Sequence, residues 1–241
     1  MHLRRYRAVL RLLATTCLFL MACLPAPVFL AHAQTPPSRE EMAAYTDLHA
    51  AAVEGNIGEI ERLVRVGADV NARDAFGRTP LTVVAYRRDI AVARALIELG
   101  ANPNTLDHQS YDVTTIAAVQ NDLQMLQLFI ASGGNTRAIT SPYVGTALIA
   151  AAHLGHSEIV EALIAGRAPL DHINNLGWTA LLEAIVLGDG GARHQATVGA
   201  LVKAGADLNL SDRQGATPLA LARARGFIGI AQVLEQAGAK P

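Results

Sequence analysis

Histidines and one glycine-rich segment are the residues whose types and spacing could support chemistry in this 241-residue chain. His153 and His156 are three residues apart, a spacing that can bring two imidazoles to one metal ion, but no third ligand recurs in phase with them. The segment LGDGG, Leu187–Gly191, lacks the Lys-Ser/Thr pair of a phosphate-binding loop. No serine, histidine and aspartate have a spacing suited to a catalytic triad. We therefore expect no catalytic residue, no metal, no cofactor and no small-molecule substrate.

Asp189 and His194 are the two residues that support an enzyme as the alternative function. Both belong to LGDGGARHQ, Leu187–Gln195, where they could share a site. The alternative function is thus an enzyme, or a metal-dependent accessory protein, that uses residues 187–195. A solvated surface loop is the simpler interpretation of such a segment.

A fixed period organises the rest of the chain. The string GADVN at Gly67–Asn71 returns as GANPN at Gly100–Asn104 and as GGNTR at Gly133–Arg137, with equal steps between the three copies. It reappears as GADLN at Gly205–Asn209 and, after one more step of the same length, as GA at Gly238–Ala239. A period of this length indicates a stack of identical supersecondary units, in which each unit buries its apolar face against its neighbours.

A second motif follows most of these strings, with its threonine 12 or 13 residues after the first glycine. Thr79-Pro80-Leu81 and Thr217-Pro218-Leu219 begin it with a threonine that can cap a helix and a proline suited to the first helical turn. An alanine-rich stretch, a turn and a second apolar stretch come next. The second stretch carries one column of large apolar residues: Leu63, Leu96, Phe129, Leu163, Leu201 and Leu234.

Together these motifs resemble the ankyrin repeat. From Thr146, the string TALIAAAHLGHSEIVEALI matches the family pattern TPLHxAAxxGHxEIVxxLL almost position by position. The resemblance implies an all-α repeat solenoid of stacked helix-turn-helix units with β-hairpin loops, and a protein that binds a protein partner through its hairpin tips and concave helix face. It also implies structural roles for His49 and His156, with His49 bonded to the neighbouring loop. Six repeats are expected, at 46–78, 79–111, 112–145, 146–178, 179–216 and 217–241.

Some positions depart from the pattern. Asp112-Val113-Thr114-Thr115 replaces the Thr-Pro-Leu-His motif, which predicts a less firm helix start. Arg88 takes the place of a turn glycine, where a left-handed conformation costs a residue with a Cβ on the order of 1 kcal/mol. Arg167 likewise replaces a loop glycine. The step from Gly133 to Gly205 is longer than two periods, and most of the extra length falls in residues 187–195.

Aromatic and arginine side chains gather at the expected hairpin tips, one or three residues before each threonine position. Tryptophan, tyrosine and arginine are the residue types enriched at binding hot spots. We expect the partner-binding residues to be Phe76, Arg78, Tyr111, Tyr143 and Trp178. The alternative, packing against the next hairpin, is strongest for Phe76 and Leu176.

Residues 1–33 have the features of a secretory signal peptide. Four arginines precede an apolar run from Leu12 to Leu24, and Ala31-His32-Ala33 supplies a small-x-small cleavage site. Cleavage after Ala33 would leave a polar linker, residues 34–45, before the repeats, and a periplasmic or secreted protein. The alternatives are an uncleaved membrane anchor or a lipid on Cys23, and only through these would the protein contact a membrane.

Net charge and cysteine content indicate which partners and which cellular compartment suit the protein. The chain has 20 basic and 21 acidic residues, and four of the arginines lie in the leader, which leaves 16 basic against 21 acidic residues and a net charge of −5. That balance argues against nucleic-acid binding, which needs a basic face. Both cysteines, Cys17 and Cys23, lie in the leader, so the remaining chain suits an oxidising compartment.

Overall fold

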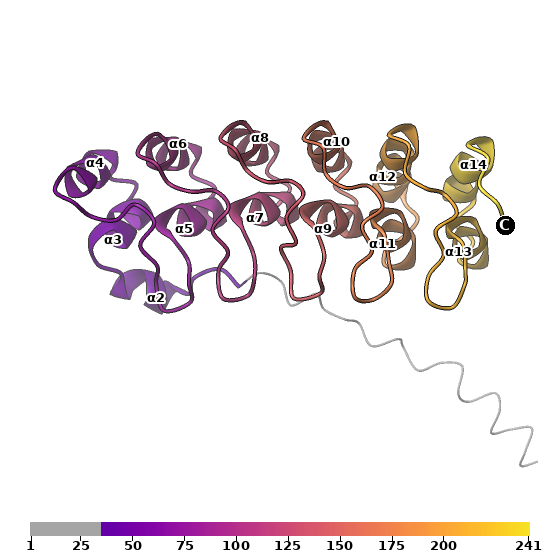
Figure 1. Cartoon of the computed structure of the whole chain (residues 1–241), viewed down its shortest axis with the longest axis horizontal. Coiled ribbons are helices and arrows are strands. Elements are labelled where there is room, and N and C mark those ends of the chain that lie inside the picture. Colours follow the sequence, from indigo (N-terminus) through magenta and orange to yellow (C-terminus); the bar gives the residue numbers. More distant parts are fainter. Residues whose placement is uncertain (1–34) are drawn as a thin grey trace, which may run out of the picture. The chain divides into compact units, whose positions relative to one another are not determined.

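A computed structural model describes residues 35–241 of the chain. These residues form thirteen helices joined by loops, and they contain no strand. The predicted signal peptide, residues 1–33, lies outside the described residues. Helix α2 spans Arg39–Ala44, and the other twelve helices form two parallel rows (Figure 1). The first row contains α3 (Asp47–Glu54), α5 (Pro80–Arg87), α7 (Val113–Val119), α9 (Ala147–Leu154), α11 (Ala180–Val186) and α13 (Pro218–Ala224). The second row contains α4 (Ile57–Arg65), α6 (Ile90–Glu98), α8 (Leu123–Ala131), α10 (Ser157–Ala165), α12 (Ala192–Lys203) and α14 (Ile228–Gln236).

The two rows bury one continuous core between adjacent units. Leu96, Phe129, Leu163, Leu201 and Leu234 have no solvent exposure, and Leu63 packs partly buried against the same core. Each first-row helix contacts the next first-row helix along the chain. The expected all-α repeat solenoid is therefore confirmed. Within residues 35–241, no helix combines the length and hydrophobicity needed to cross a membrane.

Side-chain caps fix where the first-row helices begin. The hydroxyls of Thr79, Thr146, Thr179 and Thr217 each accept a hydrogen bond from the backbone N–H three residues later. The third unit, expected to start less firmly, is capped as well. The Asp112 carboxylate accepts the Thr115 N–H at 2.8 Å and is 1% exposed. The replacement for threonine is itself a good capping residue, so that expectation was wrong.

Left-handed backbone occurs where the sequence pattern places turn and loop glycines. Arg88 has φ of 60° and Arg167 has φ of 66°, so both arginines carry the strain of a left-handed residue with a Cβ. The insertion in the fifth unit does not form a solvated loop throughout. Helix α12 begins at Ala192 and is 12 residues long, whereas the other second-row helices have nine. Most of the extra length therefore becomes an additional helical turn.

Asparagines of the repeated loop motif link several units to the next. Asn104 donates from Nδ2 to the Gly133 carbonyl at 3.0 Å and accepts the Asn135 N–H on Oδ1 at 2.7 Å. Asn71 makes the equivalent contacts one period earlier, accepting the Asn102 N–H at 2.8 Å. The last residue of the GADVN motif thus satisfies backbone groups of the next unit's loop.

Helix α2 forms inside the segment expected to be a polar linker. The Ser38 hydroxyl accepts the Glu41 N–H at 3.1 Å, and the Glu41 carboxylate accepts the Ser38 N–H at 2.7 Å, which is a capping box. Tyr45, directly after α2, donates its hydroxyl proton to Asp74 at 2.7 Å. Residues 39–45 therefore belong to the folded unit and contact the first hairpin loop.

Candidate partner-binding surface

Hairpin-shaped loops between consecutive units carry the residues predicted to contact a partner. An Asp or Asn at the start of the turn makes the shape in four of these loops, and Ser141 takes this place in the loop that carries Tyr143. Asp74 Oδ1 accepts the N–H groups of Phe76 and Arg78, each at 2.8 Å, and Asp74 N–H bonds the Arg78 carbonyl at 2.9 Å. Asn174 accepts the N–H groups of Leu176 and Trp178 in the same way, each at 3.0 Å. These turns are closed without strands among the described residues.

Neighbouring hairpins are bonded to each other through their tips. The His108 N–H donates to the Phe76 carbonyl, and the Asn175 N–H donates to the Tyr143 carbonyl, both at 2.9 Å. The guanidinium of Arg73 reaches the Leu106 carbonyl, and that of Arg213 reaches the Asn175 carbonyl. Loops held in this way present their side chains in a fixed arrangement, which lowers the entropy lost when a partner binds.

Three of the five predicted contact residues lie on the accessible surface. Phe76 is 50% exposed, and Tyr143 and Trp178 are partly exposed. For Phe76 the packing alternative is disfavoured by this exposure. Leu176 is partly buried, so packing remains a reasonable description of it.

Arg78 and Tyr111 differ from the prediction, because both are buried, with 3% and 6% exposure. Both residues lie one position before a helix cap, as Trp178 does, but unlike Trp178 their side chains are covered by the surrounding structure. Neither side chain is accessible to a partner in this structure, and the candidate surface is corrected accordingly. The Tyr111 backbone helps to close its own hairpin, with its N–H donated to Asp107 at 2.9 Å. Burial raises the pKa of Asp107, and backbone hydrogen bonds from Tyr111 and Gln109 oppose that rise.

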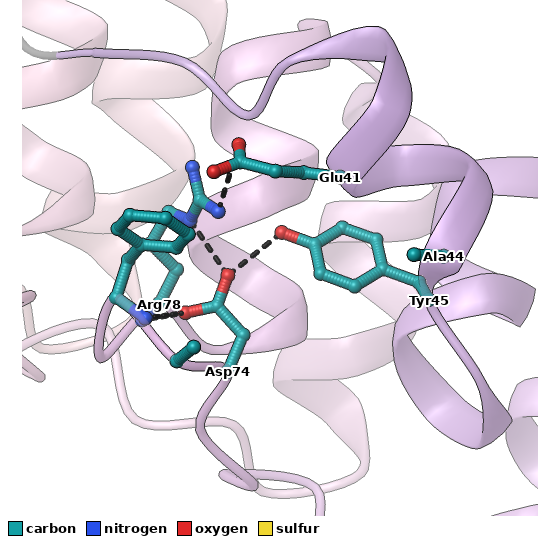
Figure 2. A pocket seen from close by; sticks show the side chains of 7 residues that line it. Glu41, Ala44, Tyr45, Asp74 and Arg78 are labelled. Atoms are coloured by element: carbon teal, nitrogen blue, oxygen red, sulfur yellow. Dashed lines mark hydrogen bonds and ion pairs between the residues drawn. The ribbon is translucent and has the colours of Figure 1, made fainter.

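Arg78 forms the centre of a polar network beneath α2 (Figure 2). Its Nε donates to Asp74 at 2.7 Å, and its Nη2 donates to Glu41 at 3.2 Å. Burial alone would raise the pKa of Asp74, but hydrogen bonds from the Tyr45 hydroxyl and from Arg78 outweigh it and hold that pKa below its usual value. Asp74 therefore remains a carboxylate that neutralises the buried arginine.

Apolar residues missed by the sequence analysis extend the same surface. Ile139, Val144 and Ile173 are 50%, 41% and 49% exposed, on the loops beside Tyr143 and Trp178. Val144 also has φ of 58°, an outlier for a β-branched residue. Its carbonyl accepts a hydrogen bond from His172 Nε2 at 2.6 Å. β-branched residues at loop positions were the signal that could have identified this group.

The histidines hold helices in place. His49 Nε2 lies 3.0 Å from the Arg78 carbonyl in the neighbouring loop, and His156 Nδ1 lies 3.0 Å from the Ala118 carbonyl of the preceding unit. Burial lowers the pKa of His156, and the nearby charge of Arg193 adds to that effect. The roles that the resemblance implied for these two residues are confirmed.

His194 is a further structural residue, which corrects the view of residues 187–195 as a solvated loop. Its side chain is buried, with Nδ1 2.7 Å from Asp189 and Nε2 2.9 Å from the His153 carbonyl. Asp189 itself is exposed, and hydrogen bonds from Gly191 and His194 lower its pKa. Across residues 35–241, no group of three or more His, Cys, Asp or Glu is arranged to hold a metal ion.

Comparison with known proteins identifies the family. Models of ankyrin repeats match residues 48–97 and 114–212. The ankyrin repeat protein YahD of Escherichia coli strain K12 is 38% identical over 190 residues, which cover 78% of this chain and 94% of YahD. The chain belongs to the ankyrin-repeat family. Ankyrin repeats mediate protein–protein interactions, and proteins built from them are typically non-enzymatic.

Solved structures agree with this assignment. The crystal structure of an ankyrin repeat domain from Acinetobacter baumannii is 43% identical, with a TM-score of 0.77 over 80% of this chain and 98% of that one. The ankyrin repeat domain of Bcl-3 is 25% identical, with a TM-score of 0.74 over 82% and 88% of the two chains. A chain in the complex of a predatory endopeptidase of Bdellovibrio bacteriovorus with an immunity protein is 25% identical, with a TM-score of 0.67 over 80% and 98%.

Proposed function

We propose that this protein is an exported, non-enzymatic binding module that holds a protein partner along its hairpin tips. The observation that carries the proposal is the row of tips, which backbone hydrogen bonds join in two neighbouring pairs and which bears Phe76, Tyr143 and Trp178 at its surface. Preorganised aromatic residues supply large contact areas at a small entropic cost.

An enzyme is the class of partner that one relative supports. The complex of the predatory endopeptidase with its immunity protein contains a chain of the same fold. Binding rather than catalysis by the present chain is supported by the positions of His49, His156 and His194. Each of these histidines is bonded to a backbone carbonyl of another segment, as a structural histidine is expected to be.

Export is part of the proposal and rests on the leader sequence. A basic start, an apolar run and Ala31-His32-Ala33 favour cleavage after Ala33 and release of the repeats into the periplasm or the medium. The partner would then be a protein of that compartment or of the cell exterior.

The test uses residues 34–241 as bait in a periplasmic extract, with partner affinity measured after its identification. Replacing Tyr143 or Trp178 with Ala should each weaken binding by about 2 kcal/mol or more. The matched control is Ile228→Ala, because Ile228 is 71% exposed on second-row helix α14, away from the hairpins. All three variants should melt near the wild-type temperature.

Two results would contradict the proposal. Binding that survives loss of both Tyr143 and Trp178 but fails with Asp189→Ala would move the functional site to residues 187–195. Unfolding of Trp178→Ala would show that this residue serves the stack instead of a partner.

A further inference from the structure

A small recess opens between helix α2 and the first hairpin, next to the row of hairpin tips. Its volume is about 230 Å³, the scale of one large side chain and below the range of typical small-molecule pockets. Tyr45 and Phe76 are its aromatic lining residues, Ala75 also lines it, and Asp74 and Arg78 meet beside the Tyr45 hydroxyl (Figure 2). The recess therefore has the size and composition to receive a side chain from another protein.

The groups within the recess are fixed by their own hydrogen bonds. Asp74 accepts from the Tyr45 hydroxyl and from Arg78 Nε, each at 2.7 Å. The Arg78 guanidinium lies 4.4 Å from the centroid of the Phe76 ring, and the arginine side chain is 4% exposed. Because Arg78 is stacked, paired and buried, its charge is not available to an incoming anion.

Charge at the rim favours a cation. Glu41 and Asp74 are acidic and Arg78 is basic, so the charged residues of the recess sum to −1. Both hydrogen bonds recorded for the Glu41 carboxylate, from Ser38 and Arg78, go to Oε2. Among residues 35–241, no hydrogen bond to Glu41 Oε1 is found, and the Glu41 side chain is 28% exposed. The recess thus combines exposed aromatic surface with a carboxylate oxygen that can accept a new bond.

We propose that the recess binds the side chain of an arginine or lysine on the protein partner. The aliphatic stem lies against Tyr45 and Phe76, and the cation meets Glu41 Oε1, a charge-assisted contact with a carboxylate oxygen. A carboxylate would face the net negative charge, an apolar side chain would bring no donor to Glu41 Oε1, and a neutral donor would form a weaker bond to it than a cation does. The inference rests on the proposed function and adds that the partner is basic where it meets α2, which complements the −5 charge of residues 35–241.

The experiment is a nuclear magnetic resonance titration of residues 34–241 with two probes of matched shape. N-acetyl-arginine methylamide carries the charge, and N-acetyl-citrulline methylamide is its uncharged counterpart. We expect saturable shifts of the Tyr45 and Phe76 amide signals with the arginine probe and none with the citrulline probe. Equal shifts with both probes, or none with the arginine probe, overturn the proposal.

Variants separate the recess from the general charge of the protein. Glu41→Gln should abolish the response, whereas Glu235→Gln, at an exposed acidic residue of α14, should preserve it. Glu41 also caps α2, so a second variant is needed. Ala75→Leu fills the recess and leaves Asp74, Arg78 and Tyr45 in place, and it should also abolish the response. An unchanged response in Ala75→Leu overturns the proposed site.

The titration is independent of the proposed partner-binding row. If Tyr143→Ala and Trp178→Ala weaken partner binding but the arginine probe produces no shift, the binding function stands and the basic-side-chain recess does not. If the probe binds the recess and those two variants bind the partner normally, the proposed arginine or lysine site is supported. The proposed role of the hairpin tips is then refuted.

Discussion

His194 Nε2 lies 2.9 Å from the carbonyl oxygen of His153, so a side chain of the fifth unit satisfies the end of a helix in the fourth. The ring fits because Gly188 lies beside it. A Cβ at Gly188 would come within 2.6 Å of the His194 ring and 2.1 Å of the Ala184 carbonyl oxygen. Gly188 thus leaves room for the His194 ring, and His194, in the added turn of α12, links the fifth unit to the fourth.

Replacing His194 with Ala should destabilise the protein by about 1–3 kcal/mol, because the His153 carbonyl loses its buried partner. The free energy of unfolding in urea measures the effect. Arg193→Ala is the control, because Arg193 is the exposed neighbour on the same helical turn, and its loss should be nearly neutral. Equal stabilities of the two variants would count against a structural role for His194.

The cost of a core truncation should depend on its place in the row. Leu163→Ala, in α10, should cost about 2–5 kcal/mol, because its column position is packed from both sides. Leu234→Ala, in α14, should cost less, since among the described residues α14 has a neighbouring unit on one side only. Chemical denaturation of both variants decides the matter, and equal costs would contradict a linear stack.

Two substitutions of Asp112 separate the effect of its capping hydrogen bond on stability from the effect of its buried charge. Asp112→Ala should cost about 0.5–2 kcal/mol, because the Thr115 N–H loses its acceptor. Asparagine caps about as well as aspartate, so Asp112→Asn should keep the bond and remove the charge. The asparagine variant should be at least as stable as wild type at neutral pH.

The same pair of proteins makes a prediction about pH. Burial raises the pKa of Asp112 in the folded state, so the folded wild type binds this proton more tightly than the unfolded chain does. Wild-type stability relative to Asp112→Asn should therefore rise as the pH falls through the raised pKa, and the gap should close below the unfolded pKa. Urea unfolding of both proteins across acidic pH tests this, and a gap that widens on acidification would refute it.

Export makes a prediction about the mature chain. Expressed from the full sequence in a bacterium with a periplasm, the protein should appear in the periplasmic fraction and begin at Gln34. N-terminal sequencing and intact mass check this directly. A chain that still begins at Met1, or one that begins at a lipid-modified Cys23, would overturn cleavage after Ala33.

Repetition explains why much of the fold could be predicted from the sequence. The repeat period places Leu96, Phe129 and Leu163 at equivalent positions, and all three are fully buried. The same spacing places the threonine caps. Because the leucine column and the threonine caps recur in most units, a unit that departs from the pattern does not change the predicted fold.

The candidate site was harder to predict, because exposure depends on neighbours that do not recur. Arg78 is buried because Asp74 and Glu41 surround it, and Glu41 comes from a segment whose composition suggested a linker. The Ser38-x-x-Glu41 pattern was the available signal for α2, since it is the signature of a capping box. His194 gave no such signal, because its partner is a backbone carbonyl 41 residues away.

The row of units has a mechanical consequence. The packed helices belong to the same unit or to adjacent units, and asparagine bonds such as Asn104 to Gly133 cross from one unit to the next. A force applied to the two ends of residues 35–241 therefore passes through every junction in series. Under tension the protein should extend elastically and then lengthen in steps as units peel away, beginning at the weakest junction.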